Sequence, residues 1–158
     1  MKVTKMILLG ALLTLAETPS FAADDGRACT TAKKYIELLQ MGDFEGVGKL
    51  WAKDSVFNTP LGTQLRGQAA IADYYKTRIA AAKLILRGQN YIGNDSECYL
   101  EIWHRSSPNA DGKYVTDPNG EFHRGAADHF FVDPQGLVVE MVAYPAPTAL
   151  PLGGAAVK

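Results

Sequence analysis

The chain has 158 residues, of which 16 are basic and 17 acidic, so its formal net charge is only −1. A charge so close to balance argues against a nucleic-acid partner, and we expect none. The length that remains after the N-terminal segment described next is typical of one domain with one hydrophobic core.

Residues 1–22 have the organisation of a secretory signal peptide. Two lysines precede an uncharged run over residues 6–16, and Ala22 ends a cleavage site of small residues. The run is shorter than the about 20 apolar residues that cross a bilayer. We therefore expect a mature chain that starts at Ala23, a periplasmic or secreted location, and no stable membrane association.

Helical spacing of apolar residues predicts helices at the start of the mature chain. Residues 31–41 repeat apolar side chains at intervals of three and four, and Gly42 suits a helix C-cap. Asp43 can cap a second short helix, whose apolar residues extend to Trp51. A third helix, with an apolar and aromatic face, is predicted over residues 68–83.

The apolar pattern changes to a period of two after the third helix, which predicts strands. These strands cover residues 84–92, 97–105, 121–132 and 137–144, after a first strand that begins at Val56. Helices followed by antiparallel strands predict an α+β fold, in which a curved antiparallel sheet wraps around the N-terminal helices and leaves a conical cavity. We expect this domain to span residues 23–144, and the Pro- and Gly-rich residues 145–158 to form a flexible tail.

Cys29 and Cys98 are the only cysteines of the chain. In an oxidising compartment they could form a disulfide between the start of the first helix and a central strand. The alternative is a pair of unlinked buried thiols, and sequence spacing does not decide between the two.

Several short motifs occur in the order in which ketosteroid isomerases carry them. Residues 34–39 with Gly42-Asp43 resemble the first-helix motif of those enzymes, and residues 52–71 resemble the strand, turn and helix start that follow it. Asp128-His129-Phe130 extends the likeness into the late strands. The chain therefore resembles ketosteroid isomerase and the SnoaL-like proteins of the nuclear transport factor 2-like superfamily. The resemblance implies a cystatin-like α+β barrel, no cofactor, and a homodimer that pairs through the outer sheet face.

The resemblance assigns roles to Tyr35 and Asp128. In the isomerases, a tyrosine of the first helix and a protonated aspartic acid of a late strand both donate hydrogen bonds to the substrate carbonyl oxygen. Independently, strand alternation places Asp128 on the same side as four apolar residues, which are Phe122, Ala126, Phe130 and Val132. Burying a carboxyl among the apolar side chains of one strand face costs free energy, so we expect it to have a hydrogen-bond partner or a functional role. Burial also keeps such a carboxyl protonated.

The chain departs from the isomerases at the general base. Their aspartate directly before the turn proline is replaced by Thr59, which cannot take a proton from carbon at neutral pH. Strand alternation places His104 on the cavity side, so His104 is the first candidate base. His123 is the second, because the long hairpin before it leaves the register open. In the polyketide cyclases of this fold, a pocket aspartate is itself acid and base, and Asp128 could do the same.

We expect a closed cavity that is large enough for a fused-ring ligand. The residues expected to contact the substrate are Trp51, Phe57, Thr59, Tyr75, Leu100, Ile102, Phe130 and Met141. The three histidines lack the spacing of a metal site, so no metal is expected. The predicted function is that of a cofactor-independent isomerase, lyase, dehydratase or cyclase, acting on a hydrophobic carbonyl or phenolic compound through an enolate-like intermediate. The alternatives are a non-catalytic exported ligand-binding protein and a module that serves mainly to form dimers.

Overall fold

The structure is a computed structural model that describes residues 26–146. The expected signal peptide over residues 1–22, the start at Ala23 and most of the expected tail lie outside these residues. Within the described range, no helix is long and apolar enough to cross a membrane.

Two helices begin the described chain, α1 (Gly26–Met41) and α2 (Phe44–Lys49). The α1 helix ends as expected at Gly42, whose φ of 71° is in the left-handed region that glycine tolerates. The side chain of Asp43 accepts the N–H of Gly46 at 2.8 Å and so caps α2. Trp51, expected at the end of this helix, instead begins strand β1 (Trp51–Asn58).

The third predicted helix is continuous but not uniform. It consists of α3 (Gln68–Tyr74), a π-helical turn η1 (Tyr75–Ile79) and α4 (Ala80–Ala82). The Thr77 hydroxyl donates to the carbonyl of Asp73 at 2.8 Å, which satisfies a carbonyl in this wider segment. The apolar and aromatic face expected over this helix is at least partly buried from Ile71 to Ala82 across the π-turn, and Tyr75 is fully buried.

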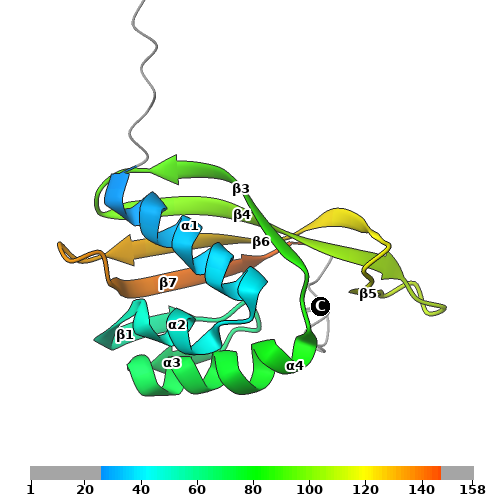
Figure 1. Cartoon of the computed structure of the whole chain (residues 1–158), viewed down its shortest axis with the longest axis horizontal. Coiled ribbons are helices and arrows are strands. Elements are labelled where there is room, and N and C mark those ends of the chain that lie inside the picture. The colour runs from blue at the N-terminus through cyan, green and yellow to red at the C-terminus, as the bar shows by residue number, and fades with distance from the viewer. Residues whose placement is uncertain (1–25, 147–158) are drawn as a thin grey trace, which may run out of the picture.

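Seven strands form one sheet in the order β2-β1-β7-β6-β4-β3, with β5 paired to β4. Besides β1, they are β2 (Gln64–Arg66), β3 (Leu86–Gly93), β4 (Glu97–Pro108), β5 (Tyr114–Thr116), β6 (Glu121–Val132) and β7 (Val138–Pro145). The β1–β7 pairing is parallel and the others are antiparallel. Figure 1 shows the sheet curling around the helical layer, while the ends of β4 and β6 extend past the helices together with β5. This is the α+β half-barrel that the sequence predicts.

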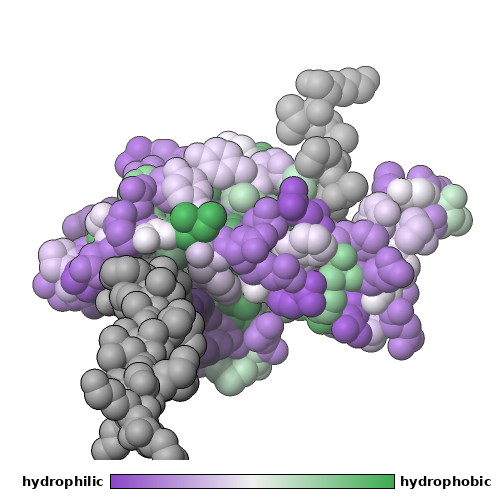
Figure 2. Space-filling view, turned by 90° about the horizontal axis from the view of Figure 1, so that it is seen from above, coloured by the Kyte–Doolittle hydropathy of each residue, from purple (hydrophilic) through white to green (hydrophobic). Residues whose placement is uncertain are grey.

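The hydrophobic core lies between the concave face of the sheet and the helices. Its fully buried members include Trp51, Tyr75, Phe130 and Met141. Hydrophilic side chains cover most of the face seen in Figure 2, where the hydrophobic groups form small separate areas. The core side chains lie on the inside of the curl, while a few large apolar residues, among them Met41 and Ile92, are exposed.

A β-bulge interrupts the alternation of β6. Ile102 pairs with Ala126 but the next residue, Trp103, pairs with Arg124, so Gly125 is an extra residue in β6. Phe122 therefore points to the outer face, where the guanidinium groups of Arg87 and Arg105 lie 4.3 and 4.8 Å from the centre of its ring. The expectation that Phe122 shares a face with Asp128 is wrong, because one inserted residue reverses the parity.

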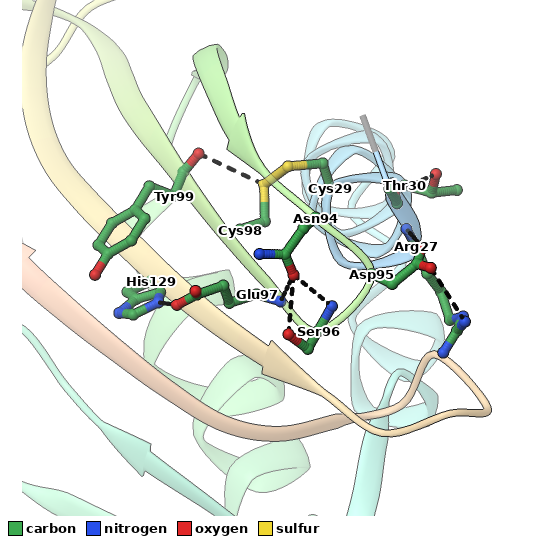
Figure 3. The surroundings of a disulfide bond; sticks show 11 residues. Arg27, Cys29, Thr30, Asn94, Asp95, Ser96, Glu97, Cys98, Tyr99 and His129 are labelled. Atoms are coloured by element: carbon green, nitrogen blue, oxygen red, sulfur yellow. Dashed lines mark hydrogen bonds and ion pairs between the residues drawn. A yellow bond between two sulfur atoms is a disulfide. The ribbon is translucent and has the colours of Figure 1, made fainter. Parts of the chain in front are cut away.

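A disulfide joins Cys29 of α1 to Cys98 of β4, with the two Cα atoms 5.0 Å apart (Figure 3). The turn between β3 and β4 also holds the first turn of α1. The N–H of Ala28 donates to the carbonyl of Asn94 at 3.2 Å, and the N–H of Arg27 donates to Asp95 Oδ1 at 3.0 Å. The structure therefore contains a disulfide and not two unlinked thiols. This bond joins the N-terminal end of α1 to the sheet.

Reduction of this disulfide should lower the free energy of unfolding by about 4 kcal/mol, because the unfolded chain loses a constraint across a long loop. Urea unfolding of the oxidised and reduced protein measures the difference. In the control, a Cys29→Ala/Cys98→Ala variant should give the same curve with and without reductant. Coincident curves for the oxidised and reduced wild type would contradict a stabilising role.

Candidate functional site

An apolar cavity lies between α1, the π-turn and the concave face of the sheet. One group of lining residues comes from the helices and their connections, and the other from the strands. They are Tyr35, Leu39, Pro60, Tyr74, Tyr75, Ile79 and Leu84, together with Phe57, Leu86, Ile102, Ala126, Asp128 and Ala143. Asp128 is the only acidic or basic residue in this set.

Asp128 is a buried acidic residue on the concave face of the sheet. It lies in the middle of β6, paired with Leu100 on one side and Ala143 on the other, and only 2% of its surface is exposed. Its Oδ1 atom has no hydrogen-bond partner within residues 26–146. Burial raises the pKa of Asp128 to about 7. An unpaired buried polar atom is costly, so this oxygen is suited to bind a ligand or water that enters the cavity.

Two tyrosine hydroxyls from different helical segments meet in the same cavity. Tyr35 of α1 and Tyr75 of the π-turn share a hydrogen bond of 3.1 Å between their hydroxyl oxygens. Burial raises the pKa of each phenol well above its ordinary value, and the negative charge of nearby Asp128 raises both further. The pair therefore stays protonated at physiological pH and offers neutral hydrogen-bond donors close to the carboxyl.

Aromatic rings fill most of the space around these groups. Phe57 stacks on Tyr75 with 6.0 Å between ring centres, and Tyr74 meets Phe57 edge-on at 5.6 Å. The remaining cavity has a volume of about 40 Å³, which is room for about three water molecules. A fused-ring compound does not fit this space as the side chains stand, so the expected cavity size is wrong. The aromatic rings that were expected to line the closed cavity pack against one another.

The residues expected to contact substrate fall into two groups. Tyr35, Phe57, Tyr75, Ile102 and Asp128 line the cavity. A second group lies behind them in the core, at most 1% exposed and outside the lining set, so its contact with a ligand stays a prediction; it consists of Trp51, Leu100, Phe130 and Met141.

Tyr74 is a lining residue that the sequence analysis missed. Its hydroxyl is buried and has no hydrogen-bond partner among the described residues. Helical spacing places Tyr74 on the same apolar and aromatic face as Tyr75, but it does not show which side chains of that face reach the cavity. The π-turn that begins at Tyr75 was not visible in the spacing.

Thr59 stabilises the turn in which it lies. Its hydroxyl oxygen accepts the N–H of Thr63 at 3.1 Å, and its carbonyl accepts the N–H of Gly62 at 3.0 Å. Thr59 is buried and is not among the lining residues. Its expected contact with substrate stays a prediction, and the structure gives its side chain a turn-forming role.

His104 lies on the concave face of β4, beside the cavity but not in its lining. It pairs with the lining residue Leu86 across the β3–β4 ladder and is fully buried. Neither ring nitrogen has a hydrogen-bond partner in the described part of the chain. Burial, and then the neighbouring His123, lowers the pKa of His104, so the ring is neutral at physiological pH, as a base must be. Its catalytic role stays a prediction.

Metal binding finds no support in the described residues, which contain no group of three or more His, Cys, Asp or Glu side chains that could hold an ion.

The raised pKa of Asp128 makes stability depend on pH. The folded state holds the proton of Asp128 up to a pH of about 7, whereas an unfolded aspartate releases it near its ordinary pKa of about 3.9. Wild-type stability should therefore fall as pH rises between these values. Asp128→Asn cannot ionise, so its stability relative to wild type should increase by about 4 kcal/mol from pH 4 to pH 8. Urea unfolding of both proteins across this range measures the difference, and other titrating groups cancel. A constant difference at every pH would mean that the carboxyl titrates normally.

Comparisons with solved structures show the same fold in proteins of different sequence. The chain is similar to the epoxide hydrolase/cyclase-like enzyme SalBIII, which is described in pyran ring formation in the polyether salinomycin, with a TM-score of 0.61 and 19% identity over 79% of this chain and 95% of that one. It is also similar to Rv0760c from Mycobacterium tuberculosis in complex with estradiol-17β-hemisuccinate, with a TM-score of 0.60 and 20% identity over 77% and 95%.

A third similar structure is a computationally designed 17-OHP binder, with a TM-score of 0.59 and 20% identity over 77% of this chain and 94% of that one. No curated protein sequence matches the chain. The model of the SnoaL-like domain family matches residues 32–141, which include the cavity residues from Tyr35 to Asp128. The chain therefore belongs to the SnoaL-like domain family.

Proposed function

We propose that this domain binds a hydrophobic carbonyl or phenolic compound at Asp128 and the Tyr35–Tyr75 pair, and transfers a proton on it without a cofactor. The observation that carries the proposal is the buried carboxyl of Asp128, whose Oδ1 atom has no hydrogen-bond partner among residues 26–146 and whose pKa of about 7 lies at the pH where general acids and bases work best. The reaction class is isomerisation, elimination or ring closure through an enolate-like intermediate.

The proton transfer starts from the ionised carboxyl. Asp128 takes a proton from the carbon next to the substrate carbonyl; the electron pair of that C–H bond forms a C=C bond, and the π pair of the C=O bond moves to oxygen to give an enolate. The carboxylic acid then returns the proton, to the same carbon or to another one. Because the pKa of Asp128 is near neutrality, both its forms are well populated at pH 7.

The tyrosines stabilise the oxygen on which charge develops. Tyr35 can donate to that oxygen while it accepts the hydrogen bond of Tyr75, which strengthens the donor. Their raised pKa values keep both protons in place, and the surrounding aromatic rings make the site apolar. Such preorganised donors in an apolar site contribute strongly to catalysis.

A non-catalytic binding protein is the second candidate. Thr59 favours this candidate, because it puts no ionisable group at the position of the isomerase base. Its hydroxyl instead accepts a hydrogen bond within the turn. The similar structures named above include a designed binder and a steroid complex as well as an enzyme, so fold alone supports either candidate.

We also propose that the protein works outside the cytoplasm and as a homodimer. The Cys29–Cys98 disulfide supports the location, because disulfides persist in oxidising compartments. The exposed Tyr99 and Tyr144 in strands β4 and β7 support pairing through the outer sheet face.

Wild-type protein should accelerate exchange of the protons next to the carbonyl of 2-tetralone in deuterated water, as followed by NMR. Asp128→Asn should lose about 100-fold in rate because it removes the base, and Tyr35→Phe should lose about tenfold or more because it removes an oxyanion donor. The wild-type rate should rise as pH increases through about 7, since the carboxylate is the active form.

His104→Gln is the matched variant for the identity of the base. If it abolishes exchange and Asp128→Asn does not, His104 is the base and the role given to Asp128 is wrong. Binding of 2-tetralone without exchange would leave the second candidate as the function.

Binding of a fluorescent naphthol should weaken as pH rises through about 7, because the protonated carboxyl donates to the ligand and the carboxylate cannot. Asp128→Asn keeps a neutral donor and should retain binding, whereas Asp128→Leu should lose about 1–3 kcal/mol. Tyr35→Phe should weaken binding in the same direction. Titrations of the three variants across pH test this, and equal affinities throughout would show that these donors are not a ligand site.

A further inference from the structure

A second hollow adjoins the Asp128 cavity, and it is the larger of the two. It lies between the C-terminal end of α1, the start of α2 and the connection from α4 to β3. We call it the outer groove; its lining residues are Leu39, Gln40, Met41, Gly42, Phe44, Ile79, Lys83, Leu84 and Leu86. Its volume is about 270 Å³, against about 40 Å³ for the inner cavity.

The two spaces share one wall of aliphatic side chains. Leu39, Ile79, Leu84 and Leu86 line both the inner cavity and the outer groove. Leu39 and Leu86 are buried in the core, whereas Ile79 and Leu84 are partly exposed, so these two can move between staggered rotamers with the smaller loss of packing. The inner cavity alone is far smaller than the roughly 300–1,000 Å³ of pockets that hold drug-sized ligands, but the two spaces together approach that range.

The outer groove has both polar and apolar lining residues, and one of them is charged. Lys83 is the only charged residue among its described lining residues, and it is exposed. Its backbone has a φ of 48°, in the left-handed conformation that ends the helical segment at the rim of the groove. Within residues 26–146 its ammonium group takes part in no ion pair.

We propose that the outer groove is the entrance to the Asp128 site and holds the carboxylate end of an amphipathic ligand, next to Lys83. The ring end of the same ligand displaces the aliphatic wall and reaches Asp128 and Tyr35. This inference rests on the proposed function, since it takes the inner cavity as the site of the ring. It adds that the ligand is a hydrophobic carboxylic acid.

The test compares two probes that differ only in charge. They are 3-(6-hydroxynaphthalen-2-yl)propanoic acid and its primary amide, titrated by fluorescence against wild type and variants. Wild type should bind the acid about fivefold more tightly than the amide, the gain expected from one exposed ion pair. Lys83→Met should abolish this preference, so that acid and amide bind with equal affinity, and Lys83→Arg should retain it. Lys53→Met, which removes a lysine of β1 outside the groove lining, is the control and should behave as wild type.

An undiminished preference for the acid in Lys83→Met would overturn the carboxylate site. Asp128→Leu separates this failure from failure of the proposed function. If the inner cavity is the ring site, Asp128→Leu weakens both probes equally. If it binds both probes as wild type does, or if wild type binds neither probe, the proposed function fails as well.

The entrance is tested separately by the rate of binding. Leu84→Trp places a larger side chain in the shared wall and should slow association of the amide probe at least tenfold in stopped-flow measurements. Leu137→Trp makes the same change at an exposed position in the β6–β7 turn and should leave the rate unchanged. Equal association rates for Leu84→Trp and wild type would overturn entry through the groove.

Discussion

The structure depends on one constraint, which is that the carboxyl of Asp128 is buried on the concave face of the sheet, where its Oδ1 atom has no hydrogen-bond partner among residues 26–146. The free-energy cost of that burial must be met by packing elsewhere. The curled sheet and α1 provide this stabilising packing, because together they enclose an aromatic core. The Tyr35–Tyr75 hydrogen bond lies in the same core. The same desolvation that destabilises the ionised carboxyl brings its pKa to about 7, so the cost in stability and the chemical usefulness have one origin.

The position of α1 is fixed by connections at its N-terminal end. The disulfide from Cys29 and the backbone hydrogen bonds with the β3–β4 turn tie this end to the sheet. Tyr35 lies two turns further along the helix and thus takes its place over β6 from that anchor. The C-terminal end of α1, with Leu39 and Met41, borders the outer groove. One end of the helix is therefore held covalently and the other lies where the aliphatic wall separates groove from cavity.

Tight aromatic packing and ligand binding make opposite demands on this interior. The contacts of Phe57 with Tyr74 and Tyr75 stabilise the fold and leave little free volume. A ligand of useful size must replace some of these contacts or open the shared wall. The π-turn lies at this point, with Tyr75 at its start and Ile79 at its end, and such turns are often found at functional sites. The π-turn thus makes the helix less regular at the place where side chains must move to admit a ligand.

Local periodicity and capping signals predict the fold class, the helix caps and the inward direction of Ile102, His104 and Asp128, because each of these depends on residues that are close together in the chain. The ordered motifs of the sequence also identified Tyr35 and Asp128. Tertiary structure alone decided the rest. The bulge at Gly125 reversed the parity of Phe122, and a bulge depends on how two strands pair. The Cys29–Cys98 bond required a distance between segments far apart in the chain. Whether an inward aromatic ring lines a cavity, like Tyr75, or fills the core, like Trp51, depends on its neighbours in three dimensions, which spacing along one chain does not specify.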